Sequence, residues 1–191
     1  NLKLRWQRGA ETVSAGLAGI ARKDQRELTL ELTGNITADD LTYSQLTVPK
    51  LAASSTKPLI FRYDFDKKQL QQLGAEFVLT SPIVSWGTKV LKIEKFQTNI
   101  AFVAANNIRE TQITLRNASA DLFAGTIRIP ESSLKLEERL HQLTLKLEAL
   151  DLTQVLSLYQ QEKITVTGTI DGSLPVTFGE NGISVEKGMI E

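Results

Sequence analysis

Only a few side chains in this sequence have the type and spacing that catalysis or metal binding requires. The single histidine, His141, lies between Leu140 and Gln142 in a charged stretch. A general base needs an orienting partner and a metal ion usually needs companion ligands, and the sequence has neither a second histidine nor a cysteine. We therefore expect an ordinary surface or half-buried histidine, no metal site and no cofactor.

Two pairs of neighbouring acids could supply the two carboxylates of an acid–base mechanism. One pair is Asp39 and Asp40, and the other is Glu137 and Glu138. Neighbouring residues of a strand point to opposite faces of a sheet, so neither pair converges on one substrate atom. A solvated turn is the preferred interpretation of both pairs, and the chain is predicted not to be an enzyme.

The overall composition is that of a folded chain without a nucleic-acid partner. Hydrophobic residues make up 41% and charged residues 23%, and 22 basic residues balance 22 acidic ones. Nucleic-acid binding requires clustered excess positive charge, so this balance argues against it. The chain starts at Asn1 and stops at Glu191 within an alternating run, so we expect residues 1–191 to be a single β-rich fragment of a longer chain. No run approaches the 18 apolar residues of a membrane span.

The elements that would position any site are mainly strands, because apolar and polar residues alternate with a period of two along much of the chain. Threonine on one side of such a run and Val, Ile or Leu on the other is a composition typical of strands. The alternating apolar positions are Leu28, Leu30 and Leu32; Ile113 and Leu115; Ile127 and Ile129; Ile164, Val166 and Ile170; Leu174, Val176 and Phe178.

Turn dipeptides and helix signals divide these runs. Gly34-Asn35, Asp171-Gly172 and Asn181-Gly182 are hairpin-type dipeptides, and the last 28 residues are predicted to form a meander. Two short helices are predicted, at 66–73 and at about 152–160 after an Asp151 cap. Residues 134–141 slightly favour helix and 142–149 favour strand. Similar residue spacings in 28–50 and 111–131 suggest a weak internal repeat.

A sheet with one face of Leu, Ile, Val and Phe must cover that face, and two short helices are too few to do so. Either a second sheet closes a sandwich, or the sheet folds on itself and leaves a groove for an apolar guest. From the residues by themselves the closed sandwich is the preferred alternative. It would make the chain a binding module for protein or glycan with a structural role.

The C-terminal part of the sequence resembles a known family. The segment 149–159 (ALDLTQVLSLY) leads through VTGTIDG at 166–172 and Leu174-Pro175-Val176 to GISVEKG at 182–188. This succession resembles the YdbH family of AsmA-like envelope proteins, and residues 113–127 resemble its strand–glycine–strand units, with Ala124 where a second glycine is usual. The resemblance covers residues 111–190 well and residues 1–110 only in general style.

The resemblance implies a mainly β fold, with a curved, mostly antiparallel sheet shaped as a U-shaped, β-taco-like groove. It also implies a periplasmic bridge that carries phospholipid between inner and outer membranes and is anchored to the inner membrane by a segment absent from this chain. The expected partners are phospholipid acyl chains and a small outer-membrane lipoprotein (YnbE-like), added as a strand at the C-terminal end of the full protein. The predicted groove lining is Ile113, Leu115, Ile127, Ile129, Leu143, Leu145, Ile164, Val166, Leu174 and Val176.

Overall fold

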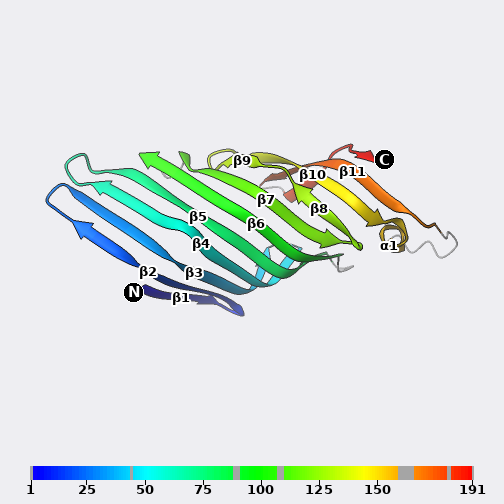
Figure 1. The fold of residues 1–191 in the computed structure, drawn as a ribbon, viewed down its shortest axis with the longest axis horizontal. Helices are drawn as coiled ribbons and strands as arrows, with labels where there is room; N and C mark the ends of the chain where they lie inside the picture. The colour runs from blue at the N-terminus through cyan, green and yellow to red at the C-terminus, as the bar shows by residue number, and fades with distance from the viewer. Residues whose placement is uncertain are drawn as a thin grey trace.

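The computed structural model describes residues 2–43, 45–87, 91–106, 110–158, 166–179 and 182–190. Within these residues the chain is mainly β, as predicted, with one antiparallel sheet and one short helix, α1 (Leu152–Ser157) (Figure 1). The strands are β1 (Leu2–Arg8), β2 (Glu11–Lys23), β3 (Glu27–Tyr43), β4 (Leu46–Asp64), β5 (Gln69–Trp86), β6 (Leu91–Asn106), β7 (Gln112–Leu122), β8 (Gly125–Ile129), β9 (Ser132–Lys135), β10 (Leu140–Asp151), β11 (Thr169–Gly179), β12 (Gly182–Val185) and β13 (Met189–Ile190).

The order of the strands in the sheet follows their order in the chain. From β1 to β8 each strand pairs with the next, after which β10 pairs with β8, β11 with β10 and β12 with β11. The short strand β9 continues beside β7, and β13 lies beside β11. The sheet does not close into a barrel, and β1 and β12 are the two ends of the strand order. No helix in the described part of the chain is long and apolar enough to cross a membrane.

The strands β2 to β6 are unusually long, with β4 reaching 19 residues, against about five or six in a typical strand. These strands continue through residues with turn-like backbone angles, some of which form bulges in the strand pairing and do not end the strand. Asp40 of β3 and Lys95 of β6 adopt positive φ angles of 56° and 50°, and Asn117 of the following strand β7 adopts one of 53°. The pairing register shifts near Lys95 and Asn117. Such bulges bend a strand and increase its twist without ending it.

The helix expected at 66–73 is wrong. The Asp64 carboxylate accepts a hydrogen bond from the Lys67 backbone N–H at 2.9 Å, which closes a turn, and β5 begins at Gln69 by pairing with Asp64. The helical preference of 134–141 is also wrong, because β9 runs to Lys135 and β10 begins at Leu140. Residues 142–149 belong to β10, which confirms the predicted strand. In both failures, pairing with neighbouring strands overrides a local helical pattern.

Two of the expected hairpin turns lie inside strands instead. Gly34 is within β3, where its backbone N–H donates to the Ser55 hydroxyl at 2.8 Å. Asp171-Gly172 lies within β11, and the Asp171 carboxylate accepts from the Ala149 N–H at 3.0 Å. The strand expected over 164–170 begins only at Thr169, and residues 164 and 165 lie outside the described residues.

The other two local predictions at the C-terminal end hold. Antiparallel pairing of Gly179 with Gly182 confirms a hairpin at Asn181-Gly182, although Asn181 itself lies outside the described residues. Helix α1 is capped as predicted, since the Asp151 carboxylate accepts the Gln154 N–H at 3.0 Å. The helix ends at Ser157, and the expected extension to residue 160 falls partly outside the described residues.

Candidate functional site

Backbone pairing sorts the side chains of the sheet into two faces, because directly opposite residues of neighbouring strands point the same way. In the β10–β11 pair, Leu145 is opposite Leu174, whereas Lys146 is opposite Ser173. Leu147, on the same side as Leu145, is opposite Ile127 of β8. The C-terminal strands therefore carry leucine and isoleucine on one face and polar residues on the other.

The same apolar face continues across the bulge in β7. Gln97 and Asn99 of β6 lie on one face and are opposite Ser119 and Arg116. Leu115 and the neighbouring apolar positions of β7 therefore share the other face. There the pairing continues from strand to strand, and we call this side of the sheet the apolar face. Its members include Val176, Leu174, Leu145, Leu147, Ile127, Ala120, Leu115, Ile100, Phe77, Leu79, Ala53, Ile36 and Ala15.

The side chains of these members of the apolar face are half-buried or buried, although the described strands form one sheet. Phe77, Leu147 and Val176 retain less than a tenth of their exposure. The rings of Phe77 and Phe102 stack at 6.2 Å, joining β5 to β6 along this face. Mutual contact between side chains of the same face thus shelters them in part, without a second sheet in the described residues.

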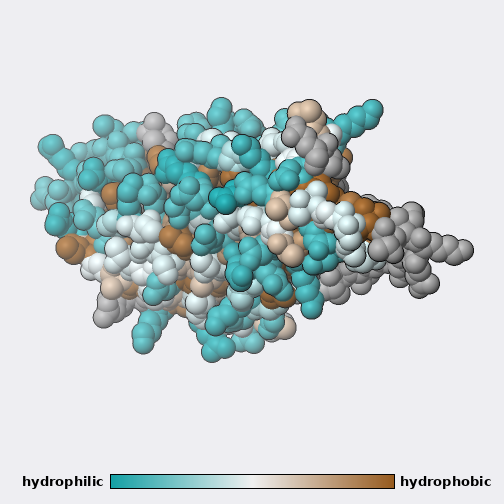
Figure 2. All heavy atoms as spheres, turned by 45° about the vertical axis from the view of Figure 1, so that its right-hand side comes forward, coloured by the Kyte–Doolittle hydropathy of each residue, from teal (hydrophilic) through white to brown (hydrophobic). Residues whose placement is uncertain are grey.

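The opposite face, here called the polar face, carries a row of ion pairs. Lys57 contacts Glu76 at 2.6 Å and Arg128 contacts Glu148 at 2.7 Å. Lys95 donates to the Asp121 carboxylate at 2.7 Å, and this hydrogen bond raises the pKa of Lys95. Figure 2 shows hydrophilic side chains over most of the surface visible in that view, with smaller hydrophobic areas between them. Exposed pairs of this kind contribute little to stability and mark a face that meets water.

The structure brings most of the predicted lining residues together on the apolar face. Ile164 lies outside the described residues. Val166 belongs to no strand, and its carbonyl accepts a hydrogen bond from the Thr153 hydroxyl of α1 at 2.8 Å. The predicted residues found on the apolar face are Ile113, Leu115, Ile127, Ile129, Leu143, Leu145, Leu174 and Val176.

Sequence reasoning missed the part of the apolar face formed by β5 and β6. Phe77 and Leu79 alternate with Val78 and Thr80, and this alternation is the sequence signal for their shared face. It was hidden because residues of β5 on the polar side, such as Val78, are also apolar. Strands that are apolar on both sides lose the contrast on which a period of two depends.

The structure places the histidine and the acidic pairs that were considered for catalysis or metal binding as follows. His141 is half-buried with its ring 5.2 Å from that of Phe178, as expected for an ordinary histidine. Glu137 lies in the turn after β9, but Asp39 and Asp40 lie inside β3, so the turn expected there is wrong. Among the described residues no three His, Cys, Asp or Glu side chains gather closely enough to hold a metal ion.

Comparison with known proteins assigns a family to the C-terminal half of the chain. Residues 97–191 match a family model described as YdbH-like, intermembrane phospholipid transport protein YdbH. No curated protein and no solved structure matches the chain. The matched residues run from β6 to the C-terminal end and include the strands on which the predicted lining residues lie.

Proposed function

Since the chain belongs, through residues 97–191, to the YdbH-like family of intermembrane phospholipid transport proteins, we propose that its apolar face carries phospholipid acyl chains. The proposed setting is the periplasm, where the sheet would form part of a bridge between the inner and outer membranes. The observation that carries the proposal is the apolar face itself. It runs from β2 to β11, and no second sheet lies among the described residues.

The composition of this face suits a ligand that has to move. Burial of apolar surface contributes about 0.8 kcal/mol per methylene group and has no preferred direction. A row of Leu, Ile, Val and Phe side chains therefore holds an acyl chain by many equivalent contacts. None of these contacts is strong enough to fix the chain at one position, so sliding along the face requires no specific bond to break.

The contrast between the two faces supports an open carrier. A one-layer sheet is stable in water when one face is solvated and the other is covered. Ion pairs such as Lys57–Glu76 and Arg128–Glu148 place charged groups on the polar face, where water can solvate them. A large apolar face without a second sheet over it is typical of a ligand or partner surface. Phospholipid acyl chains would provide that cover.

We further propose that the sheet curves into a U-shaped, β-taco-like groove with the apolar face inside. Positive φ angles within strands, at Asp40, Lys95, Asn117 and Ala149, support this shape. Bulges of this kind bend strands and sharpen the twist of a sheet. The half-burial of the apolar face is the degree of shelter that a concave surface gives to its own side chains.

The partner proposed for the C-terminal end is a small outer-membrane lipoprotein (YnbE-like) that adds a strand to the sheet. The outer edge of β11 is covered only by the short strands β12 and β13 among the described residues. Val185 and Met189 of these strands are 60% and 71% exposed. A sheet edge with exposed apolar side chains suits the addition of an extended segment.

The alternative of a closed sandwich would need a second sheet against the apolar face, and the described residues form one sheet. Native mass spectrometry of the protein, purified after mild extraction from cells, tests the proposal. We expect copurified phospholipid that is lost on stringent delipidation. A protein that never carries lipid, and whose apolar face is protected from solvent labelling without it, would contradict the proposal.

A further inference from the structure

A cation, Lys23, lies on the side of the sheet that carries the apolar face, at the end of a strand. Lys23 is the last residue of β2 and is opposite Leu28 of β3. Leu28 is opposite Tyr63 of β4, and Tyr63 is opposite Leu70 of β5. These side chains form one row across four strands on the same side of the sheet. Lys23 thus marks the limit of the apolar face where the strands end.

The position of Lys23 is fixed by two hairpin tips that are tied together. The Phe65 backbone N–H donates to the Arg26 carbonyl at 2.7 Å, and the Arg26 guanidinium lies 3.6 Å from the Asp66 carboxylate. The Asp24 carboxylate accepts the backbone N–H groups of Arg26 and Glu27, both at 2.7 Å. These hydrogen bonds, that of Arg26 first, lower the pKa of Asp24.

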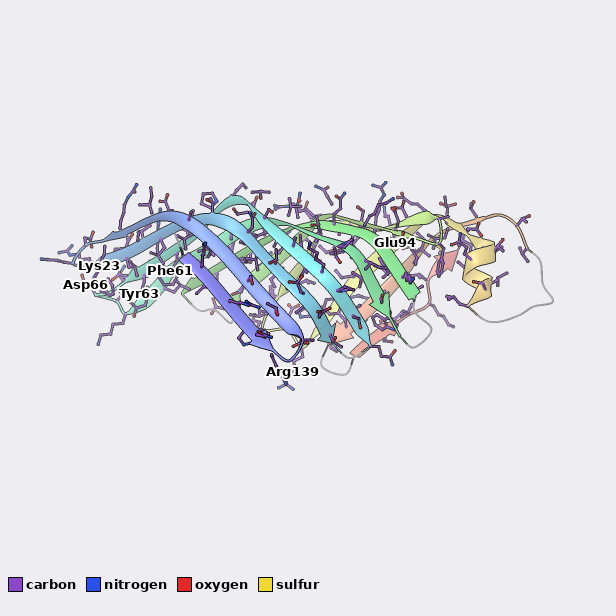
Figure 3. All side chains as sticks on the ribbon, turned by 90° about the horizontal axis from the view of Figure 1, so that it is seen from below. Lys23, Phe61, Tyr63, Asp66, Glu94 and Arg139 are labelled. Carbon is purple, nitrogen blue, oxygen red and sulfur yellow. The ribbon has the colours of Figure 1, made fainter. Side chains whose placement is uncertain are left out.

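One aromatic ring contacts the ammonium group of Lys23, and a second ring packs against the first. The Lys23 Nζ lies 5.6 Å from the centre of the Phe65 ring, a cation–π contact. Tyr63 meets Phe65 edge to face at 5.4 Å. Figure 3 shows Lys23, Phe61, Tyr63 and Asp66 at one end of the sheet, away from Glu94 and Arg139. Phe61, opposite Leu30 and Leu73, continues the apolar face inward from this cluster.

The charge of Lys23 is not matched by an ion pair within the described part of the chain, whereas two cations at the adjoining hairpin tips are paired. Arg26 contacts Asp66 and Lys67 contacts Asp64, each at 3.6 Å. On the same side of the sheet, Arg8 and Glu11 are opposite each other at the other end of β2. A positive charge without an ion pair among the described residues therefore stands where the apolar face reaches the ends of β2 to β5.

We infer that Lys23 binds the phosphate group of an amphiphile whose acyl chains lie on the apolar face beside Leu28, Leu30 and Phe61. This inference rests on the proposed function and names the residue that receives the head group. An ammonium group binds phosphate as a compact point charge, and a tyrosine such as Tyr63 suits a boundary between apolar and wet surroundings. Inorganic phosphate carries the same kind of negative charge as the lipid head group, but it has no acyl chains to contact the aromatic and leucine side chains.

The test compares three probes on the delipidated protein by isothermal titration calorimetry at low salt. The probes are dihexanoyl phosphatidylglycerol below its micelle concentration, dihexanoylglycerol, which lacks the phosphate, and inorganic phosphate. Lys23→Met keeps the stem against Phe65 and removes the charge, and Lys23→Arg restores a cation. Arg22→Met is the matched control, because Arg22 neighbours Lys23 in sequence and is opposite Thr29 on the polar face.

We expect Lys23→Met to weaken phosphatidylglycerol binding about fivefold and to leave dihexanoylglycerol binding unchanged, a size suited to an exposed charge contact. Lys23→Arg should restore the affinity, and Arg22→Met should change it less than twofold. Equal losses at Arg22 and Lys23, no loss at Lys23, or inorganic phosphate binding as tightly as the lipid would each overturn the inference. Failure of the wild type to bind either lipid probe would instead contradict the proposed function.

Discussion

Leu174 lies directly opposite Leu145 in the β10–β11 pair, while the adjacent Ser173 and Lys146 are opposite each other on the other face. Leu174 and Ser173 are neighbours in one strand, so their backbone surroundings are almost the same, yet their side chains lie on opposite faces of the sheet. This pair of positions allows the role of the apolar face to be separated from the stability of the sheet. Moving a substitution by one residue, from Leu174 to Ser173, moves the introduced charge from the apolar face to the polar face.

We predict that Leu174→Glu abolishes lipid copurification while the sheet survives. A carboxylate on the apolar face is costly to desolvate, so it stays hydrated and interrupts the track for acyl chains. Ser173→Glu, on the polar face, should retain lipid. Thermal melting and lipid analysis of both purified variants make the comparison.

The opposite result would favour a closed core. If Leu174 were packed under a second layer, Leu174→Glu would unfold the protein, because a buried charge costs several kcal/mol against a total stability of about 5–15 kcal/mol. A Leu174→Glu variant that unfolds, together with a wild type that never carries lipid, would contradict the open apolar face. A folded variant that still carries lipid would show that this position is not part of the track.

Asp151→Ala is expected to destabilise the protein by about 1 kcal/mol, because the Gln154 N–H loses its acceptor at the start of α1. Asp151→Asn keeps a side-chain oxygen of equal capping ability and should cost much less. Urea unfolding of the two variants measures the difference. Equal losses for alanine and asparagine would show that the carboxylate acts through its charge and not as a cap.

Gly125→Ala should destabilise the protein by about 1–3 kcal/mol through overpacking. A methyl group at this position would lie 2.5 Å from the carbonyl oxygens of both Glu148 and Ala149, which belong to the paired strand β10. Gly16→Ala is the matched control, since its added methyl meets nothing within 4 Å, and its effect should stay within about 0.5 kcal/mol. Calorimetric melting that ranks the two variants in the reverse order would contradict the close approach of β8 to β10.

The loop 24–27 should lose stability in acid through Asp24. Hydrogen bonds from the Arg26 and Glu27 N–H groups lower the pKa of Asp24 below its ordinary 3.8. A lowered carboxylate pKa contributes stability above the ordinary value, and the contribution disappears as the pH falls through the lowered value. The difference in unfolding free energy between wild type and Asp24→Asn should therefore shrink below pH 3.8. A difference that remains constant down to about pH 2 would contradict this assignment.

The faces of the C-terminal strands could be predicted from the sequence because their contrast is strong. In β7, β8 and β11, Ile, Leu or Val alternates with Thr, Arg or Ser, and the structure places Ile113, Ile127 and Leu174 accordingly. The Asp151 cap was also predictable, because a cap acts over three residues. The alternation within a strand and the cap of a helix each depend on residues close together in the sequence, so both can be read from the sequence.

The length of the strands could not be predicted, because strand pairing decides it. Gly34 and Asp171-Gly172 have turn chemistry, but neighbouring strands continue past them and hold them in β3 and β11. Likewise, Asp66 and Gly74 resemble the start and end of a helix, yet residues 69–74 pair with β4. Lys23 gave no sequence signal either. Its place on the apolar face depends on the register between β2 and β3.

The most direct test of the central claim is photocrosslinking in cells from two neighbouring residues of β7. Leu115 is opposite Ile100 on the apolar face, and Thr114 is opposite Ala101 on the polar face. With a benzophenone amino acid at each position in turn, we predict crosslinks to phospholipid from residue 115 and none from residue 114. Crosslinks to phospholipid from neither position, or equally from both, would contradict an apolar face that carries acyl chains.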